Sequence, residues 1–171
     1  MQGKATLSGH PLHPILVTFP IGCFVAAVVA DLISIWEGPA FWAEMSTWLI
    51  LFGIVGGLIA AFSGFVDYIS APMTARAKNV ASWHMTLNVA MLVIFGLACA
   101  LRFLNYHSVG GHALTGLGIV LLAISGWLGG EVAHRYLVGS PEPETGTADR
   151  TMRATEASER GELSTPSARI R

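Results

Sequence analysis

Charged side chains are scarce in this sequence. Only 12% of its 171 residues are Asp, Glu, Lys or Arg, whereas soluble domains carry about 25%. The charges are also uneven, because residues 139–171 alone hold five arginines and six acidic residues. We therefore interpret residues 1–138 as a membrane domain. Residues 139–171 contain almost no large apolar side chain, so we expect them to form a disordered polar tail.

Several signals of chemistry are also missing. The net charge is −1, which gives no reason to expect a nucleic-acid partner. The two cysteines, Cys23 and Cys99, lie in apolar runs without the CxxCH motif, which excludes covalent c-type haem attachment. Phosphate-binding loops and nucleophile motifs are absent from the sequence as well. These absences favour a protein that is not an enzyme.

Long apolar runs are abundant. Four of them reach the roughly 20 residues that a helix needs to cross a bilayer. Only helices satisfy their backbone hydrogen bonds internally in lipid, and short loops make successive helices antiparallel. The sequence thus predicts an all-α, integral membrane four-helix bundle in up-down-up-down order. The predicted spans are 14–36, 45–69, 82–104 and 112–138.

Basic residues set the expected orientation of the bundle. Lys4, Arg76, Lys78 and Arg135 fall on one side of the predicted spans, and Arg102 alone falls near the other. Because basic residues concentrate in cytoplasmic loops, we expect both termini in the cytoplasm.

A short internal similarity relates the second and fourth spans. Residues 61–65 read AFSGF and residues 123–127 read AISGW, while His13 and His84 open the first and third spans. Two hairpins of one kind, related by an axis along the membrane normal, would explain the match, and chance similarity is the alternative. In such a repeat, both histidines would point across the core at the same depth.

Polar groups converge at the end of the bundle where the first and third spans begin. Ionisable groups in spans usually face a partner or a cavity, so this cluster is the candidate site. The alternative is that they cap helices or reach to water. Asn88 follows His84 by one helical turn and joins the same face. At the opposite end, we expect His107 and His112 to be solvated. The converging residues are His10, His13, Asp67, His84, Glu131, His134 and Arg135.

Prolines mark the entry to the first span. Pro11 and Pro14 are tolerated in a first helical turn, where they stiffen the approach to His13. Pro20 lies deeper and should kink the helix, freeing the Leu16 carbonyl. Prolines are common in membrane helices, which is the alternative explanation.

Two further features concern helix contacts. Asp31 lies deep in the first span, and Arg102 is its candidate partner. Gly53–Gly57 and Gly126–Gly130 have the small-xxx-small spacing that lets helix backbones approach, which is a candidate homodimer face or generic helix packing.

The cluster is compatible with more than one ligand. His13 and His84 on diagonal helices are a natural axial pair for a b-type haem, with Arg76 and Arg135 at the rim for its propionates. Asp67, Asn88 and Glu131 would then orient the imidazoles. The competing hypotheses are metal or proton transport or sensing through the same cluster, and a structural anchor subunit. A metal site would use His13 and His84 and, with less support, His10, His134 or Glu131.

Four segments carry a family resemblance: HPLHPILVTFPIG, SGFVDY, HMTLN and SGWLGGE. They resemble the bacterial integral membrane family called domain of unknown function 2231, over about residues 8 to 140. The resemblance implies a bacterial inner-membrane location and assigns no activity. Related domains occur fused to Rieske-type iron–sulfur domains, which implies a redox role and a Rieske-type or other respiratory partner.

The resemblance carries over to individual positions, with one departure. His134 stands where relatives tend to have a tyrosine, which makes it a poor candidate for a shared ligand and leaves His13 with His84. The matching residues are His13, Pro14, Pro20, Asp67, His84, Asn88, Gly129, Gly130 and Glu131.

Overall fold

The computed structural model describes residues 6–7, 10–38 and 40–135. The predicted disordered tail, and residues 136–138 of the fourth predicted span, lie outside the described residues. The chain begins with a two-residue antiparallel pair and continues as helices. The elements are β1 (Thr6–Leu7), β2 (His10–Pro11), α1 (Leu12–Leu16), α2 (Thr18–Glu37), α3 (Ala40–Ser70), α4 (Ala75–Leu104), α5 (Val109–Gly130) and the π-helical turn η1 (Glu131–Arg135).

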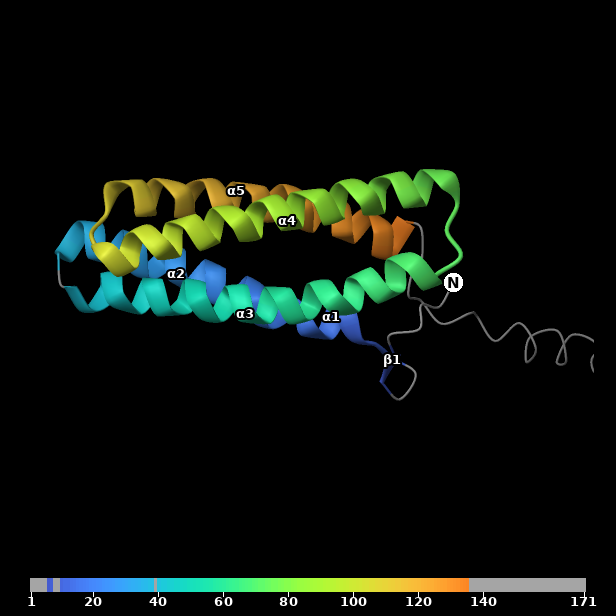
Figure 1. Cartoon of the computed structure of the whole chain (residues 1–171), viewed down its shortest axis with the longest axis horizontal. Helices are drawn as coiled ribbons and strands as arrows, with labels where there is room; N and C mark the ends of the chain where they lie inside the picture. The colour runs from blue at the N-terminus through green and yellow to red at the C-terminus, as the bar shows by residue number, and fades with distance from the viewer. Residues whose placement is uncertain (1–5, 8–9, 39, 136–171) are drawn as a thin grey trace, which may run out of the picture. The chain divides into compact units, whose positions relative to one another are not determined.

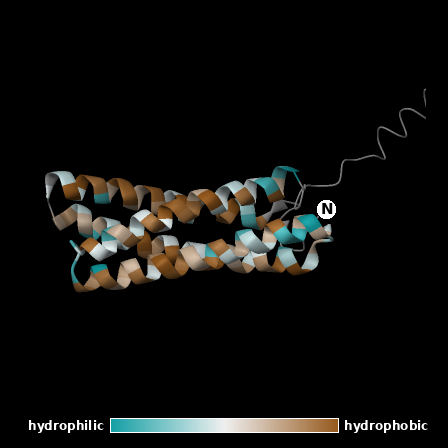
Figure 2. Ribbon diagram, turned by 90° about the horizontal axis from the view of Figure 1, so that it is seen from above, coloured by the Kyte–Doolittle hydropathy of each residue, from teal (hydrophilic) through white to brown (hydrophobic). Residues whose placement is uncertain are grey.

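The described helices form four antiparallel rods (Figure 1). Four helical stretches are long and apolar enough to cross a membrane: Leu12–Trp36, Ala40–Ser70, Ala75–Leu104 and Val109–Arg135. Apolar residues dominate the middle of the rods and hydrophilic residues gather toward their ends (Figure 2). The prediction of an all-α, four-helix membrane bundle is confirmed.

The bundle is built from two helical hairpins. We call α1, α2 and α3 the first hairpin, and α4 and α5 the second hairpin (Figure 1). The helices run beyond the predicted spans, since α4 begins at Ala75, where the Thr74 hydroxyl accepts a hydrogen bond from Ala77 N–H at 3.2 Å. Between α2 and α3 the chain turns at Gly38, whose φ of +79° favours glycine.

Pro20 lies buried near the start of α2, just after the boundary between α1 and α2 at Val17. Proline has no N–H for the carbonyl four residues earlier, that of Leu16, which accounts for the boundary at this point. Val17 keeps a helical backbone conformation, its N–H donates to the His13 carbonyl and its carbonyl accepts from Ile21 N–H, so the first span continues through this point. The kink at Pro20 stays a prediction.

The core is thin and lies where the two hairpins meet. Phe24 of α2 stacks on Phe95 of α4 with ring centroids 3.9 Å apart and planes 4° from parallel, and both rings are fully buried. We call this pair the phenylalanine layer. Ile50 of α3 is also fully buried beside it. Large apolar side chains such as Phe62 (73% exposed) cover the outside, which suits a surface that contacts lipid.

Candidate functional site

His13 and His84 face each other across the bundle. Their ring centroids lie 6.3 Å apart and the ring planes stand at 86°. His13 comes from α1 of the first hairpin and His84 from the beginning of α4 in the second. We call this pair the histidine layer and the end of the bundle that contains it the histidine end. The two histidines that the sequence placed at one depth are therefore in ring contact.

Each imidazole is held by a backbone carbonyl of its own hairpin. His13 Nδ1 lies 2.8 Å from the Ala60 carbonyl oxygen of α3, and His84 Nδ1 lies 2.8 Å from the Ser125 carbonyl oxygen of α5. A carbonyl oxygen can only accept, so Nδ1 carries the hydrogen in both rings. In the neutral form, both Nε2 atoms then present a lone pair, which is the form of histidine that binds metals.

Asn88 fixes His84 further. Its Nδ2 amide lies 3.0 Å from His84 Nε2, and the amide donates because that ring nitrogen is the acceptor. The Ser125 hydroxyl contacts the same ring at Nδ1 (3.1 Å) and donates to the His84 carbonyl. Asn88 therefore contacts the imidazole that it was predicted to orient. The same contact occupies the Nε2 lone pair of His84.

Two glycines give the imidazoles their room. A Cβ atom on Gly64 would lie 2.8 Å from the His13 ring, and one on Gly129 would lie 2.8 Å from the His84 ring. Contacts this short are essentially never seen, so a larger residue at either position would displace the adjacent imidazole. Gly129 is one of the positions that the family resemblance singled out.

The same arrangement in both hairpins reveals the internal repeat. His84, Phe95 and Arg102 each lie 71 residues after His13, Phe24 and Asp31, and each of these pairs is in contact. On the return helices, Gly118, Ser125 and Gly129 lie 65 residues after Gly53, Ala60 and Gly64 and make the matching contacts. The repeat therefore has a register that differs by three residues from the one suggested by AFSGF and AISGW.

The other residues predicted for the site also lie at the histidine end, but their surroundings differ. Asp67 is half-buried near the end of α3, and Arg76 is exposed in the first turn of α4. Glu131 pairs with Arg135, whose Nη1 lies 3.2 Å from its carboxylate, and His134 is exposed beside them. The described contacts to the imidazoles come from Ala60, Ser125 and Asn88. The side chain of His10 lies outside the described residues.

Glu131, His134 and Arg135 instead line an open groove along α5. The groove has a volume of about 490 Å³ and is otherwise lined by small residues and Trp127. Gly126 and Gly130 line it too, and a Cβ on either would meet nothing within 4 Å. The other small-xxx-small pair is used inside the chain, because a Cβ on Gly53 would strike Phe24 and one on Gly57 would strike Leu92.

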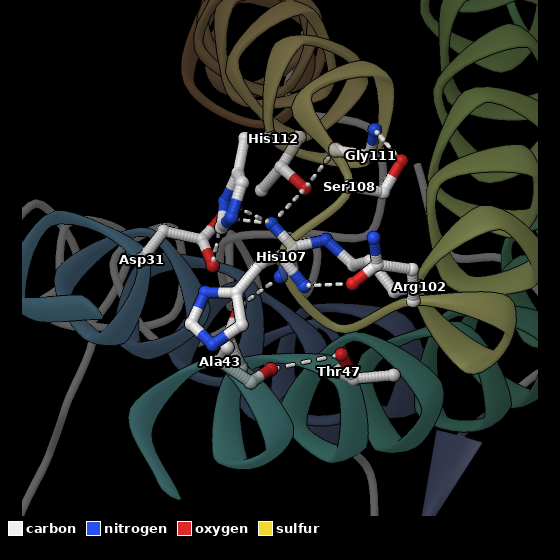
Figure 3. A network of polar contacts seen from close by, with 11 residues as sticks. Asp31, Ala43, Thr47, Arg102, His107, Ser108, Gly111 and His112 are labelled. Carbon is white, nitrogen blue, oxygen red and sulfur yellow. Dashed lines mark hydrogen bonds and ion pairs between the residues drawn. The ribbon is translucent and has the colours of Figure 1, made fainter. Parts of the chain in front are cut away.

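A second polar cluster lies at the opposite end, around Arg102. This arginine is fully buried and forms an ion pair with Asp31, which is 5% exposed (Figure 3). Its Nη1 donates to the Ser46 hydroxyl at 3.2 Å and its Nη2 lies 2.8 Å from His112 Nδ1 and 3.2 Å from the Thr115 hydroxyl. One guanidinium thereby joins α2, α3, α4 and α5. The predicted Asp31–Arg102 pair is present, and we call it the charged layer.

The expectation for His112 was wrong. It was expected to be solvated, but α5 begins at Val109, which places His112 in the first helical turn with its ring against Arg102 (Figure 3). Its side chain is 14% exposed. His107, in the loop before α5, is exposed as expected. Arg102 is likewise no loop charge, so it does not count in the orientation argument.

The donor sets limit what the described residues can hold. Over the described ranges, no group of three or more His, Cys, Asp or Glu side chains is placed to bind a metal ion. His13 and His84 supply two nitrogens, which is fewer than the three or four protein ligands of a typical zinc site.

One of three comparisons with known proteins found a match. No curated protein and no solved structure matches the chain significantly. A family model described as "Predicted membrane protein (DUF2231)" matches residues 9–142, which include all four membrane-spanning stretches, both histidines of the histidine layer and both residues of the charged layer. The chain is therefore a multi-pass membrane protein that belongs to the DUF2231 family.

Proposed function

We propose that this protein is a b-type haem-binding membrane module that carries electrons, with His13 and His84 as the axial ligands. The observation that carries the proposal is the histidine layer: two imidazoles from different hairpins, each anchored through Nδ1, meet across the bundle. Haem supplies a one-electron carrier when bound, and the protein supplies the axial nitrogens and the surrounding helices.

The ligand count favours haem over a bare metal ion. A haem iron takes four nitrogens from the macrocycle and needs only two from the protein, which is the number that the histidine layer offers. The rings of His13 and His84, with centroids 6.3 Å apart, would supply these two nitrogens from different hairpins.

The surroundings of the histidine layer supply the other requirements. Both imidazoles face each other across the bundle and are half-buried. Backbone carbonyls on Nδ1 fix ring orientation and raise ligand basicity, as they do at other metal sites. Asn88, whose amide now contacts His84 Nε2, would hold the orientation of that ring. Arg76 and Arg135 are at the same end, where they would meet carboxylates such as the haem propionates.

We further propose an orientation and a partner. Arg76, Lys78 and Arg135 all lie at the histidine end, whereas Arg102 at the opposite end is buried. The bias of basic residues supports a topology in which the histidine end, and with it both termini, faces the cytoplasm of a bacterial inner membrane. A respiratory protein of the Rieske type is the electron partner that the family resemblance suggests.

An absorbance spectrum tests the proposal. The protein is purified in mild detergent from cells supplied with a haem precursor, and is read oxidised and then reduced with dithionite. We expect a sharp b-type α band on reduction, retained in His107→Ala, which changes an exposed histidine at the opposite end. The band should be lost in His13→Ala and in His84→Ala.

A colourless preparation that stays colourless after haem is added back would refute the proposal. His84→Met guards against misfolding as the reason for a lost band, since methionine is also an axial haem ligand. A shifted spectrum in that variant would place residue 84 at the iron. If all variants fold and none affects a spectrum, the histidine layer only joins the two hairpins, as in a structural anchor subunit.

A further inference from the structure

The hydrogen-bond donors and acceptors around Arg102 are not matched in number. Arg102 Nη2 has two hydrogens but lies within reach of three acceptors: Asp31 Oδ2, His112 Nδ1 and the Thr115 hydroxyl. Meanwhile Asp31 Oδ1 is buried without a hydrogen-bond partner among the described residues. Buried carboxylate oxygens are normally paired, so this orphan atom calls for an explanation.

The protonation state of His112 follows from its contact with Arg102. A guanidinium only donates, so Nδ1 of His112, 2.8 Å from Nη2, is an acceptor and the ring is neutral with its hydrogen on Nε2. The same Nδ1 atom lies 3.4 Å from the orphan Asp31 Oδ1 (Figure 3). His112 Nδ1 thus lies between Arg102 Nη2, from which it accepts a hydrogen bond, and Asp31 Oδ1, to which it makes none.

We propose that Asp31, Arg102 and His112 form a proton-binding site. A proton from the adjacent aqueous phase adds to the Nδ1 lone pair of His112, and the new N–H donates to Asp31 Oδ1. Arg102 Nη2 then keeps two acceptors for its two hydrogens, Asp31 Oδ2 and the Thr115 hydroxyl, and Asp31 Oδ1 gains a donor. No other covalent bond forms or breaks.

The charges around His112 are compatible with this exchange. Among the described residues, the ionisable groups that meet the ring are Asp31 from α2 and Arg102 from α4, and α3 contributes only the neutral Ser46 hydroxyl to the network. His107 lies in the loop before α5 and is exposed to solvent. Asp31 and Arg102 offset each other, so a proton on His112 meets an ion pair rather than a lone cation. The ring is 14% exposed in the first turn of α5, which gives the proton a short path.

The site lies at the end of the bundle away from the histidine layer and does not depend on haem. When the site binds a proton, the Arg102–His112 contact between α4 and α5 is replaced by an Asp31–His112 contact between α2 and α5. Proton binding therefore adds a second link between the two hairpins at this end, beside the Asp31–Arg102 ion pair. The function that we infer is a response to the acidity of the solution on that side of the membrane.

Nitrogen NMR of histidine side chains tests the proposal on the unaltered protein. The chain is labelled with ¹⁵N-histidine, placed in detergent micelles and titrated from pH 8 to pH 5, and the His112 signals are identified by their loss in His112→Gln. We expect a hydrogen on Nε2 only at pH 8 and hydrogens on both nitrogens at low pH. A hydrogen on Nδ1 at pH 8, or a ring that stays neutral to pH 5 while the fold is intact, would overturn the proposal.

Variants at Asp31 identify the acceptor. Asp31→Asn removes the carboxylate that accepts from Nδ1, so His112 should keep a hydrogen on Nε2 alone at pH values where the wild-type ring carries two. Asp31→Glu keeps the carboxylate and is the matched control. The signals of His107 serve as an internal reference, because they should be the same in the wild type and in both variants. Equal His112 titrations in the wild type and Asp31→Asn would show that Asp31 does not receive the proton. If Asp31→Asn does not fold, the wild-type measurement still decides.

Discussion

The first hairpin presents His13, Phe24 and Asp31 to the bundle axis, and the second presents His84, Phe95 and Arg102 at the corresponding positions. Two of the three layers pair identical residues, whereas the charged layer pairs opposite ones. Two carboxylates or two guanidiniums at the buried axial position of the charged layer would repel each other, whereas the neutral imidazoles of the histidine layer do not. The two hairpins therefore match in their helices and in two layers, and they differ in the residues of the charged layer.

The environment of the histidine layer shows the same divergence in milder form. Asn88 hydrogen-bonds His84, and the residue at the matching position in the first hairpin is Val17, which has no side-chain amide. His13 and His84 therefore share an anchor to a backbone carbonyl, but Asn88 has no counterpart beside His13. The first hairpin has an apolar residue where the second has a hydrogen-bond donor.

The largest effect should follow from breaking the charged layer. Arg102→Leu leaves Asp31 buried without its partner, which should cost about 3–5 kcal/mol of unfolding free energy. The double exchange Asp31→Arg with Arg102→Asp should recover part of the loss, because the two positions are equivalent across the axis. Reversible unfolding in mixed detergent micelles gives both values. An exchange variant no more stable than Arg102→Leu would argue against that equivalence.

An intermediate effect is expected at the glycines beneath the phenylalanine layer. Gly53→Ala and Gly118→Ala would place a Cβ 2.6 Å from the Phe24 ring and 2.7 Å from the Phe95 ring. Overpacking of this kind costs about 1–3 kcal/mol, and the two hairpins should lose similar amounts.

Gly96→Ala and Gly116→Ala are the matched controls for that comparison. A Cβ at either site meets nothing within 4 Å, so helix propensity alone should leave these variants as stable or slightly more stable. Unequal losses at Gly53 and Gly118 in the same unfolding assay would show that the two hairpins pack differently against their phenylalanines.

The smallest effect concerns the contact between the two phenylalanine rings. A double-mutant cycle with Phe24→Leu, Phe95→Leu and the pair should yield a coupling of about 0.5–1.5 kcal/mol for the stacked rings. Thermal unfolding followed by tryptophan fluorescence is sufficient for this comparison. A coupling near zero would mean that each ring is held by its own hairpin and that the stacking adds nothing.

Part of this structure could be predicted from the sequence. The four spans, the pairing of His13 with His84 and the pair of Asp31 with Arg102 follow from apolar length, helix direction and the cost of buried charge. These features depend on residue type and on depth along a helix. Both quantities can be counted along a chain.

The rest depends on quantities that a sequence does not display. The anchors of both imidazoles are the carbonyls of Ala60 and Ser125, and every residue has a carbonyl. His112 was misjudged because α5 begins three residues before it, at Val109. The repeat register was misjudged because AFSGF and AISGW resemble each other, while the equivalent contacts follow from glycines that accommodate a ring, such as Gly53 under Phe24 and Gly118 under Phe95.

The phenylalanine layer has an electrical consequence. At 1.5 Å per residue it lies about 16 Å along the helix from the histidine layer and about 10 Å from the charged layer. Its two stacked, fully buried rings carry no group that can relay a proton. With the haem site and the proton site that we propose at opposite ends of the bundle, this layer would keep protons from passing between them along the bundle axis.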